Sequence, residues 1–240
     1  ITSPNIFVGG LVGFYYCGGY LVTGNACELS YNTNNVSLSG DNNIGGMIGR
    51  LDNQAHFSMQ HNTNTNNGAV SGTYQVGGMI GNVNADKYTD GYSHSLDAQY
   101  NESNAKVSAT DGEAGGIIGG MDSYSSSSDG KGDITIDNNT VGADVEGATD
   151  SYQIGGVIGY FYHESPQSST DLDSNVSLSN NIVNGAVKGG YGVAGVAGYL
   201  RTYDYAGTTK INLAVNNNAV NGAIVGLGDS SASQYVAGIV

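Results

Sequence analysis

The sequence has little positive charge. Seven lysines and arginines stand against 21 aspartates and glutamates, which gives a formal net charge of −14. Proteins that bind nucleic acid neutralise phosphates with many basic side chains, so this balance argues against nucleic-acid partners and anionic membrane surfaces. Long apolar runs are absent too, since glycine and polar residues interrupt every apolar stretch well before the length of a transmembrane span. We expect neither nucleic-acid binding nor membrane insertion.

Groups that carry catalysis or hold metals are equally scarce. The only arginines, Arg50 and Arg201, lie far apart, and the acidic residues are scattered, whereas glycan-processing enzymes gather carboxylates at one site. The His-Glu-Xaa-Xaa-His motif of zinc peptidases is absent, and no cysteine or carboxylate cluster completes a zinc site beside His56 and His61. We expect a protein that is not an enzyme and has no cofactor or bound metal.

Cysteine is limited to two residues, Cys17 and Cys27. Both fall in one irregular insertion and no histidine pair completes a metal site with them, so a local disulfide is favoured over two separate thiols. Disulfides persist in oxidising compartments, which suits an extracellular or cell-surface location. The chain begins at Ile1 without a methionine or a signal peptide, so we expect a mature secreted protein or a piece of a longer one.

Glycine, by contrast, is abundant, and it recurs in an apolar motif of the form Val-Gly-Gly-Leu-Val-Gly. We call this motif the glycine phrase; its copies occupy residues 8–13, 44–49, 76–81, 114–119, 154–159, 193–198 and, without a final glycine, 236–240. The second glycines of successive copies are 36, 32, 38, 40, 39 and 43 residues apart. A period of this size is typical of stacked repeat proteins, in which each unit contacts only its neighbours.

One asparagine per repeat forms a second column. Each lies six residues before an apolar residue, as Asn139 lies before Val145. Stacked amides can bond to the rungs above and below, and asparagine tolerates the left-handed backbone that a sharp corner requires. We predict an asparagine ladder made of Asn32, Asn64, Asn101, Asn139, Asn181 and Asn218.

The flanking segments predict β-strands. Polar and apolar residues alternate over 133–137, 175–179 and 210–215, and no segment shows sustained helical periodicity. A short strand after each ladder asparagine and another in the glycine phrase bring each repeat to three strands. The sequence therefore predicts a single all-β domain, 1–240, folded as a parallel β-solenoid of about six coils with a seventh begun at Val236. The segments after the phrases diverge most and should form variable loops on one edge.

The glycine phrase is apolar on both faces of a strand. One face should line the interior, and the other should form an apolar ridge made of Leu11, Met47, Met79, Ile117, Val157, Val196 and Ile239. A bare ridge of this length would be adhesive, so we expect either the chain's own segments after the phrases or another subunit to cover it.

Tyrosines concentrate in the segments after the phrases. A tyrosine ring offers a stacking face and a polar tip, so these segments could bind sugars or proteins, or could instead pack over the apolar ridge. The candidate ligand-binding residues are Tyr160, Tyr162, Tyr203 and Tyr205.

The motif Gly10-Leu11-Val12-Gly13 resembles the core of the GLUG motif, and the phrases at 44–49, 76–81, 114–119 and 154–159 are close variants. The last two copies depart from it, with alanine at Ala194 and Ala237. The resemblance covers nearly the whole chain. Proteins with such repeats are typically large bacterial surface or secreted proteins, including adhesin-like chains, so the resemblance implies an extracellular β-solenoid and no particular ligand.

These patterns favour a structural role. We expect a module or subunit of a surface fibre, stalk or adhesin that self-associates through the solenoid ends or the apolar ridge, or that continues in a longer repeat chain. The alternative is a module that binds carbohydrate or host surface proteins through the tyrosine-rich loops. A glycan-processing β-helix enzyme is a third hypothesis, which would require a carboxylate cluster on one exposed sheet.

Overall fold

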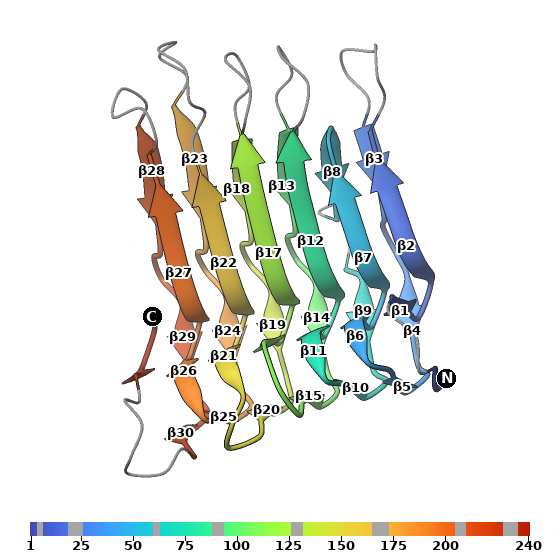
Figure 1. Ribbon diagram of the computed structural model, residues 1–240, viewed down its shortest axis with the longest axis vertical. Helices are drawn as coiled ribbons and strands as arrows, with labels where there is room; N and C mark the ends of the chain where they lie inside the picture. The colour runs from blue at the N-terminus through green and yellow to red at the C-terminus, as the bar shows by residue number, and fades with distance from the viewer. Residues whose placement is uncertain are drawn as a thin grey trace.

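The computed structural model describes residues 1–3, 7–18, 26–59, 63–87, 94–125, 132–164, 173–204, 210–227 and 235–240. Within these ranges every regular element is a β-strand, and the strands pair in parallel into five sheets with one strand per coil in each (Figure 1). The fold is therefore an all-β parallel β-solenoid, as the sequence predicts. None of the described residues forms a helix long and apolar enough to cross a membrane.

Two of the sheets contain the two halves of the glycine phrase. Sheet B consists of β1 (Val8–Gly9), β6 (Asn42–Gly45), β11 (Tyr74–Gly77), β16 (Ala114–Gly115), β21 (Tyr152–Gly155), β26 (Tyr191–Ala194) and β31 (Val236–Ala237). Sheet C consists of β2 (Val12–Cys17), β7 (Ile48–Asn53), β12 (Ile80–Lys87), β17 (Ile118–Ser125), β22 (Ile158–Glu164) and β27 (Ala197–Tyr203).

The other three sheets complete each coil. Sheet D consists of β3 (Ala26–Glu28), β8 (His56–Ser58), β13 (His94–Asp97), β18 (Gly132–Thr135), β23 (Ser174–Ser177) and β28 (Ile211–Ala214). Sheet E consists of β4 (Thr33–Asn34), β9 (Thr65–Asn66), β14 (Glu102–Ser103), β19 (Thr140–Val141), β24 (Ile182–Val183) and β29 (Ala219–Val220). Sheet A consists of β5 (Leu38–Ser39), β10 (Val70–Gly72), β15 (Val107–Ala109), β20 (Val145–Gly147), β25 (Val187–Gly189) and β30 (Ile224–Gly226).

The number of coils is close to the prediction, but the number of strands in each coil is not. Four sheets contain six strands, so five full turns separate their first and last strands, and sheet B contains seven strands. Each full coil has five strands rather than three. The sheet E strands are two residues long, too short for an alternating pattern to reveal them, and each glycine phrase contributes to two sheets instead of forming one strand.

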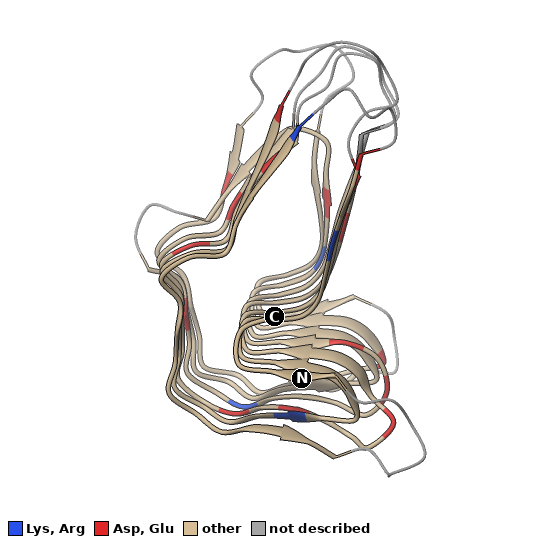
Figure 2. Ribbon diagram, turned by 90° about the vertical axis from the view of Figure 1, so that its left-hand side faces the viewer, with Lys and Arg blue, Asp and Glu red and all other residues tan. Residues whose placement is uncertain are grey.

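The glycine phrase bends the chain into the interior, so that in cross-section the solenoid is pinched between sheets B and C (Figure 2). In the second coil the bend lies at Gly46 and Met47, between β6 and β7. A Cβ atom on Gly46 would lie 2.5 Å from Cγ of Asn66 and would overlap the carbonyl oxygen of Gly78. The second glycine of each phrase thus lets the bend approach sheet E closely. The sheet E residues that oppose these glycines are Asn34, Asn66, Ser103, Val141, Val183 and Val220.

The predicted position of the apolar ridge is wrong. Its five inner members have no exposed surface and belong to the hydrophobic core: Met47, Met79, Ile117, Val157 and Val196. Only the two end members are exposed, Leu11 by 43% and Ile239 by 37%. Because the phrase bends inward instead of forming an outer wall, the solenoid itself covers both of its faces. The ridge cannot act as a lateral surface for self-association.

Candidate functional site

The asparagine ladder runs through the corner between sheets D and E. In its centre, Asn139 Oδ1 accepts hydrogen bonds from the backbone N and from Nδ2 of Asn101, both at 3.0 Å. Asn139 Nδ2 donates to Asn181 Oδ1 at 3.1 Å and to the carbonyl oxygen of Ala98 at 2.8 Å. Side-chain amide bonds link every successive pair from Asn32 to Asn218. The buried amides therefore satisfy one another, which makes the ladder a continuous spine of the stack.

The left-handed backbone lies one residue before the position that the sequence predicts. The ladder asparagines do not have positive φ angles. Five of the six residues that precede them do, namely Tyr31, Tyr100, Asn138, Asn180 and Asn217, with φ from 54° to 59°. These residues turn the corner, and the asparagine that follows directs its amide along the stack. Tyrosine occupies two of the five turning positions, so the asparagine column is explained by amide pairing and not by backbone conformation.

The ladder has a direction. In each step, amide groups of one coil donate to Oδ1 of the next coil toward the C-terminus. At the N-terminal end, Asn32 Oδ1 accepts no hydrogen bond from the described residues. At the C-terminal end, the backbone N of Asn218 has no acceptor among them. The two ends of the described stack are therefore chemically complementary.

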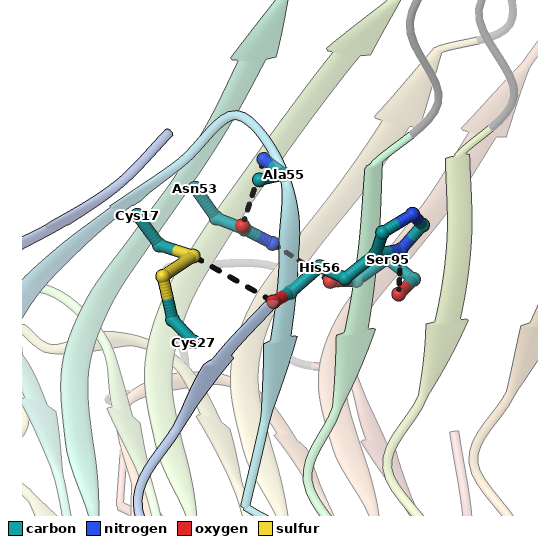
Figure 3. Close-up of a disulfide and its surroundings, with 6 residues drawn as sticks. All are labelled: Cys17, Cys27, Asn53, Ala55, His56 and Ser95. Atoms are coloured by element: carbon teal, nitrogen blue, oxygen red, sulfur yellow. Dashed lines mark hydrogen bonds between the residues drawn. A yellow bond between two sulfur atoms is a disulfide. The ribbon is translucent and has the colours of Figure 1, made fainter. Parts of the chain in front are cut away.

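The predicted disulfide is present in the first coil. Cys17 at the end of β2 is bonded to Cys27 in β3, with Cα atoms 6.0 Å apart. The close-up in Figure 3 shows the bridge beside the second coil, where Cys17 Sγ lies 3.6 Å from the carbonyl oxygen of His56. The bridge thus joins sheets C and D in the first coil of the stack.

Replacing Cys17 and Cys27 together by alanine should lower the free energy of unfolding by about 2–3 kcal/mol, because the crosslink closes a short loop and restricts the unfolded chain. Urea unfolding of the double variant against wild type measures the loss. Wild type under reducing conditions is the matched control and should unfold like the variant. Equal stability of oxidised wild type and variant would contradict a stabilising role for the bridge.

Two of the candidate tyrosines, Tyr160 and Tyr162, lie on β22 and a third, Tyr203, lies on β27; Tyr205 lies outside the described residues. The Tyr160 ring stacks on the Tyr199 ring of the next coil, with centroids 5.3 Å apart and planes inclined by 13°. These side chains therefore belong to strands rather than loops, and they stack along the solenoid axis instead of covering the apolar ridge.

Tyr162 is the centre of a polar network on the same face of sheet C. Its hydroxyl donates to Glu164 Oε2 at 2.7 Å, and the guanidinium of Arg201 lies 5.5 Å from its ring centroid and 5.6 Å from that of Tyr203. Partial burial, together with the contact with Glu164, raises the pKa of Tyr162 to about 12. The hydroxyl therefore stays protonated at neutral pH and acts as a donor.

A buried polar cluster inside the solenoid was not anticipated from the sequence. His94 Nε2 and His163 Nδ1 lie 3.1 and 3.0 Å from Ser123 Oγ, and all three residues are buried. A Cβ on Gly132 would lie 2.8 Å from His94 Nε2, so this glycine makes room for the imidazoles. His163 lies two residues after Phe161 along β22, on the same face of the strand, and this period of two is the signal that could have placed it inside.

Acid should destabilise the fold through this cluster. Burial lowers the pKa of His163 from 6.5 to about 4. Between these pH values the unfolded chain binds a proton at His163 that the folded protein does not bind. The resulting loss of stability begins as the pH falls below about 6.5, is complete below about 4, and amounts to about 3 kcal/mol. Urea unfolding between neutral pH and pH 4 measures the slope. His163→Gln should show a correspondingly weaker pH dependence, and equal slopes would contradict this assignment.

Comparison of the chain with protein-family models, with curated proteins and with solved structures found no match. Among the described residues, no group of three or more histidine, cysteine or acidic side chains is placed to hold a metal ion. Function is therefore inferred from the geometry of the ladder, the stack ends and the exposed faces.

Proposed function

We propose that this chain is an extracellular structural repeat module, part of a surface fibre, stalk or adhesin, whose ends accept further rungs of the same kind. Those rungs come from a second copy or from further repeats of a longer chain. The observation that carries the proposal is the direction of the asparagine ladder. An acceptor at Asn32 faces one way and a donor at Asn218 faces the other, which suits head-to-tail stacking.

The backbone and apolar groups at the ends support the same proposal. In sheets C, D and E the outermost strands have a partner on one side only within the described chain, and so has β30 in sheet A, whereas residues 1–3 pair with the outer edge of β5. Open strand edges template further pairing. Apolar side chains accompany them, since Leu213 in β28 is 42% exposed and Phe14 in β2 is 47% exposed. An added rung would bury both the edges and these side chains.

The aromatic columns of sheet C match across such a junction. Phe14 begins the column that ends in Tyr199, and Tyr16 begins the column that ends in Arg201. Head-to-tail stacking would place ring on ring and ring on guanidinium, both favourable pairs. Since β31 already holds the next position in sheet B, an incoming copy has to release its own β1 from that sheet. It also has to release residues 1–3, which cover the edge of its β5.

The proposed location has two supports. The Cys17–Cys27 disulfide suits an oxidising compartment, and the resemblance of the phrases to GLUG repeats points to bacterial surface or secreted proteins. The low number of lysines and arginines also leaves little with which to bind nucleic acid.

Leu213→Lys is expected to weaken self-association of the 1–240 chain by about tenfold or more, because a charge on an open strand edge opposes edge-to-edge pairing. Sedimentation over a range of concentrations measures the association, and electron microscopy should show rods that lengthen along the solenoid axis. Ile182→Lys, on a side wall and 41% exposed, is the matched control and should assemble like wild type.

A wild-type chain that remains monomeric at every concentration would contradict self-assembly. Assemblies that form equally well with Leu213→Lys, or that are lost with Ile182→Lys alone, would show lateral contacts instead of end-to-end stacking.

A further inference from the structure

The outer face of sheet D is hollowed into a groove that none of the features above explains. The groove has a volume of about 580 Å³ and is lined by residues from β8, β13, β18, β23 and β28, which belong to five successive coils. It therefore runs along the solenoid axis. The backbone of sheet D forms the wall that faces sheet C across the interior (Figure 2). A site of this shape suits an elongated ligand lying across several coils.

The groove presents one polar side chain per coil along its length. At one end, His56 Nδ1 lies 2.8 Å from Ser95 Oγ. Further along, Asn175 Nδ2 donates to Asp133 Oδ1 at 3.1 Å, and Asn212 Nδ2 donates to Asn175 Oδ1 at 3.1 Å. These bonds link side chains of adjacent coils, so the polar groups form a column along the solenoid axis.

A second polar column runs beside the first. Asp97 pairs in register with Thr135, and Thr135 pairs with Ser177, and all three line the groove. Hydroxyl, amide and carboxylate groups thus repeat at the strand spacing of about 4.8 Å. Consecutive sugar rings of an extended polysaccharide advance by a similar length, so each ring could meet the same kind of polar group on successive coils.

The charge of the groove restricts the ligand further. Among the described residues, its lining contains the carboxylates of Asp97 and Asp133 and no lysine or arginine, and the whole chain has a net charge of −14. An anionic polymer would be repelled. Sugar hydroxyls, by contrast, donate to carboxylates and amide oxygens and accept from amide and hydroxyl groups.

We propose that the sheet D groove binds an extended, uncharged polysaccharide lying along the solenoid axis. This role goes beyond the structural module and does not depend on self-assembly. It places carbohydrate recognition on sheet D, whereas the sequence pointed to the tyrosines that the structure locates on sheet C.

The test measures binding of linear neutral oligosaccharides to the 1–240 chain by calorimetry, with a β-1,4-linked glucan hexasaccharide and its disaccharide as probes. The hexasaccharide should bind about tenfold or more tightly than the disaccharide, because only the longer chain spans several coils. An oligogalacturonate of the same length should bind more weakly than the neutral hexasaccharide. Hydrogen exchange should slow in β13, β18 and β23 on binding.

Thr135→Arg is expected to lower the affinity for the hexasaccharide by about tenfold or more, since a long side chain in mid-groove blocks the path of the ligand. Ser108→Arg, on the outer face of sheet A, is the matched control and should bind like wild type. Thermal unfolding of both variants separates loss of the groove from loss of the fold.

Three results would overturn the proposal. One is the absence of binding by the neutral probes. Another is preference for the oligogalacturonate. The third is binding that Thr135→Arg leaves intact while Tyr162→Ala removes it, which would assign the ligand to sheet C.

Discussion

Asn139→Ala should lower the free energy of unfolding by about 3–5 kcal/mol, because it leaves several buried polar groups without partners. Asn139 has no exposed surface. Its loss removes the acceptor of the backbone N and Nδ2 of Asn101, and it also removes the donor to the Ala98 carbonyl oxygen. Each buried group left without a partner costs about 1–3 kcal/mol, and domains typically have only about 5–15 kcal/mol of stability. Urea unfolding followed by circular dichroism measures the change.

Asn104→Ala is the matched control for the ladder. Asn104 lies in the coil before Asn139 and its Nδ2 donates to Asn67 Oδ1 at 3.3 Å, but this bond is exposed to water. The control should change stability by less than about 0.5 kcal/mol. Asn139→Asp offers a second comparison. Aspartate has the same shape as asparagine, but a carboxylate oxygen would replace the amide nitrogen that donates to Asn181 Oδ1, so two acceptors would face each other. A stability of Asn139→Ala within the range of the Asn104 control would refute the ladder as the spine of the stack.

Gly116→Ala is expected to cost about 3 kcal/mol or more, by overpacking the bend where the glycine phrase meets sheet E. The added Cβ would lie 2.6 Å from both methyl groups of Val141 and would overlap the carbonyl oxygen of Gly156. Backbone lies on one side and a buried side chain on the other, so neither neighbour can move without disturbing an adjacent coil. Thermal and urea unfolding measure the effect.

Gly142→Ala separates this close approach from a general effect of removing glycine. At Gly142 the new Cβ would meet only the flexible Asn104 side chain, at 2.9 Å, and all other atoms lie at 3.6 Å or beyond. Adding Val141→Ala to Gly116→Ala should restore stability, because it removes the methyl groups that the new Cβ would overlap. The restoration should be only partial, because the overlap with the carbonyl oxygen of Gly156 remains. If Gly116→Ala proved as stable as Gly142→Ala, the phrase would not be held against sheet E as described.

The stacking could be predicted from the sequence because successive coils carry similar residues at equivalent positions. Parallel strands paired in register place like residues over like, so a column in the sequence becomes a column in space. Ile44 pairs with Val76 and Gly45 with Gly77, as the alignment of the phrases requires. The same logic identified the asparagine column.

The prediction of an outer apolar ridge was wrong about which face of the glycine phrase is covered and about what covers it. A strand that is apolar on both faces indicates burial on both, but it does not reveal whether an outside partner or the chain itself supplies the cover. Met47 and Met79 were expected on an outer ridge and lie in the core. The reason is the bend at the second glycine, which depends on sheet E, and sheet E has no pattern of its own in the sequence.

The features of the exposed faces could not be predicted from single segments either. The tyrosines were expected in loops, but Tyr160 and Tyr162 alternate with Phe161 and His163 along one strand, with their rings outside and the others inside. The sheet D groove was not anticipated, because it depends on how five coils curve together and not on any single segment.

The sequence by itself determined that this protein is a stack of similar coils with an amide spine and a single disulfide, since these properties follow from residue type and spacing. The tertiary structure alone decided where each coil bends, which apolar face lies inside and which wall is hollowed. The physical reason is that register along the stack is a local property of paired strands, whereas the shape of a coil is set by contacts between segments on opposite walls, such as Gly46 against Asn66.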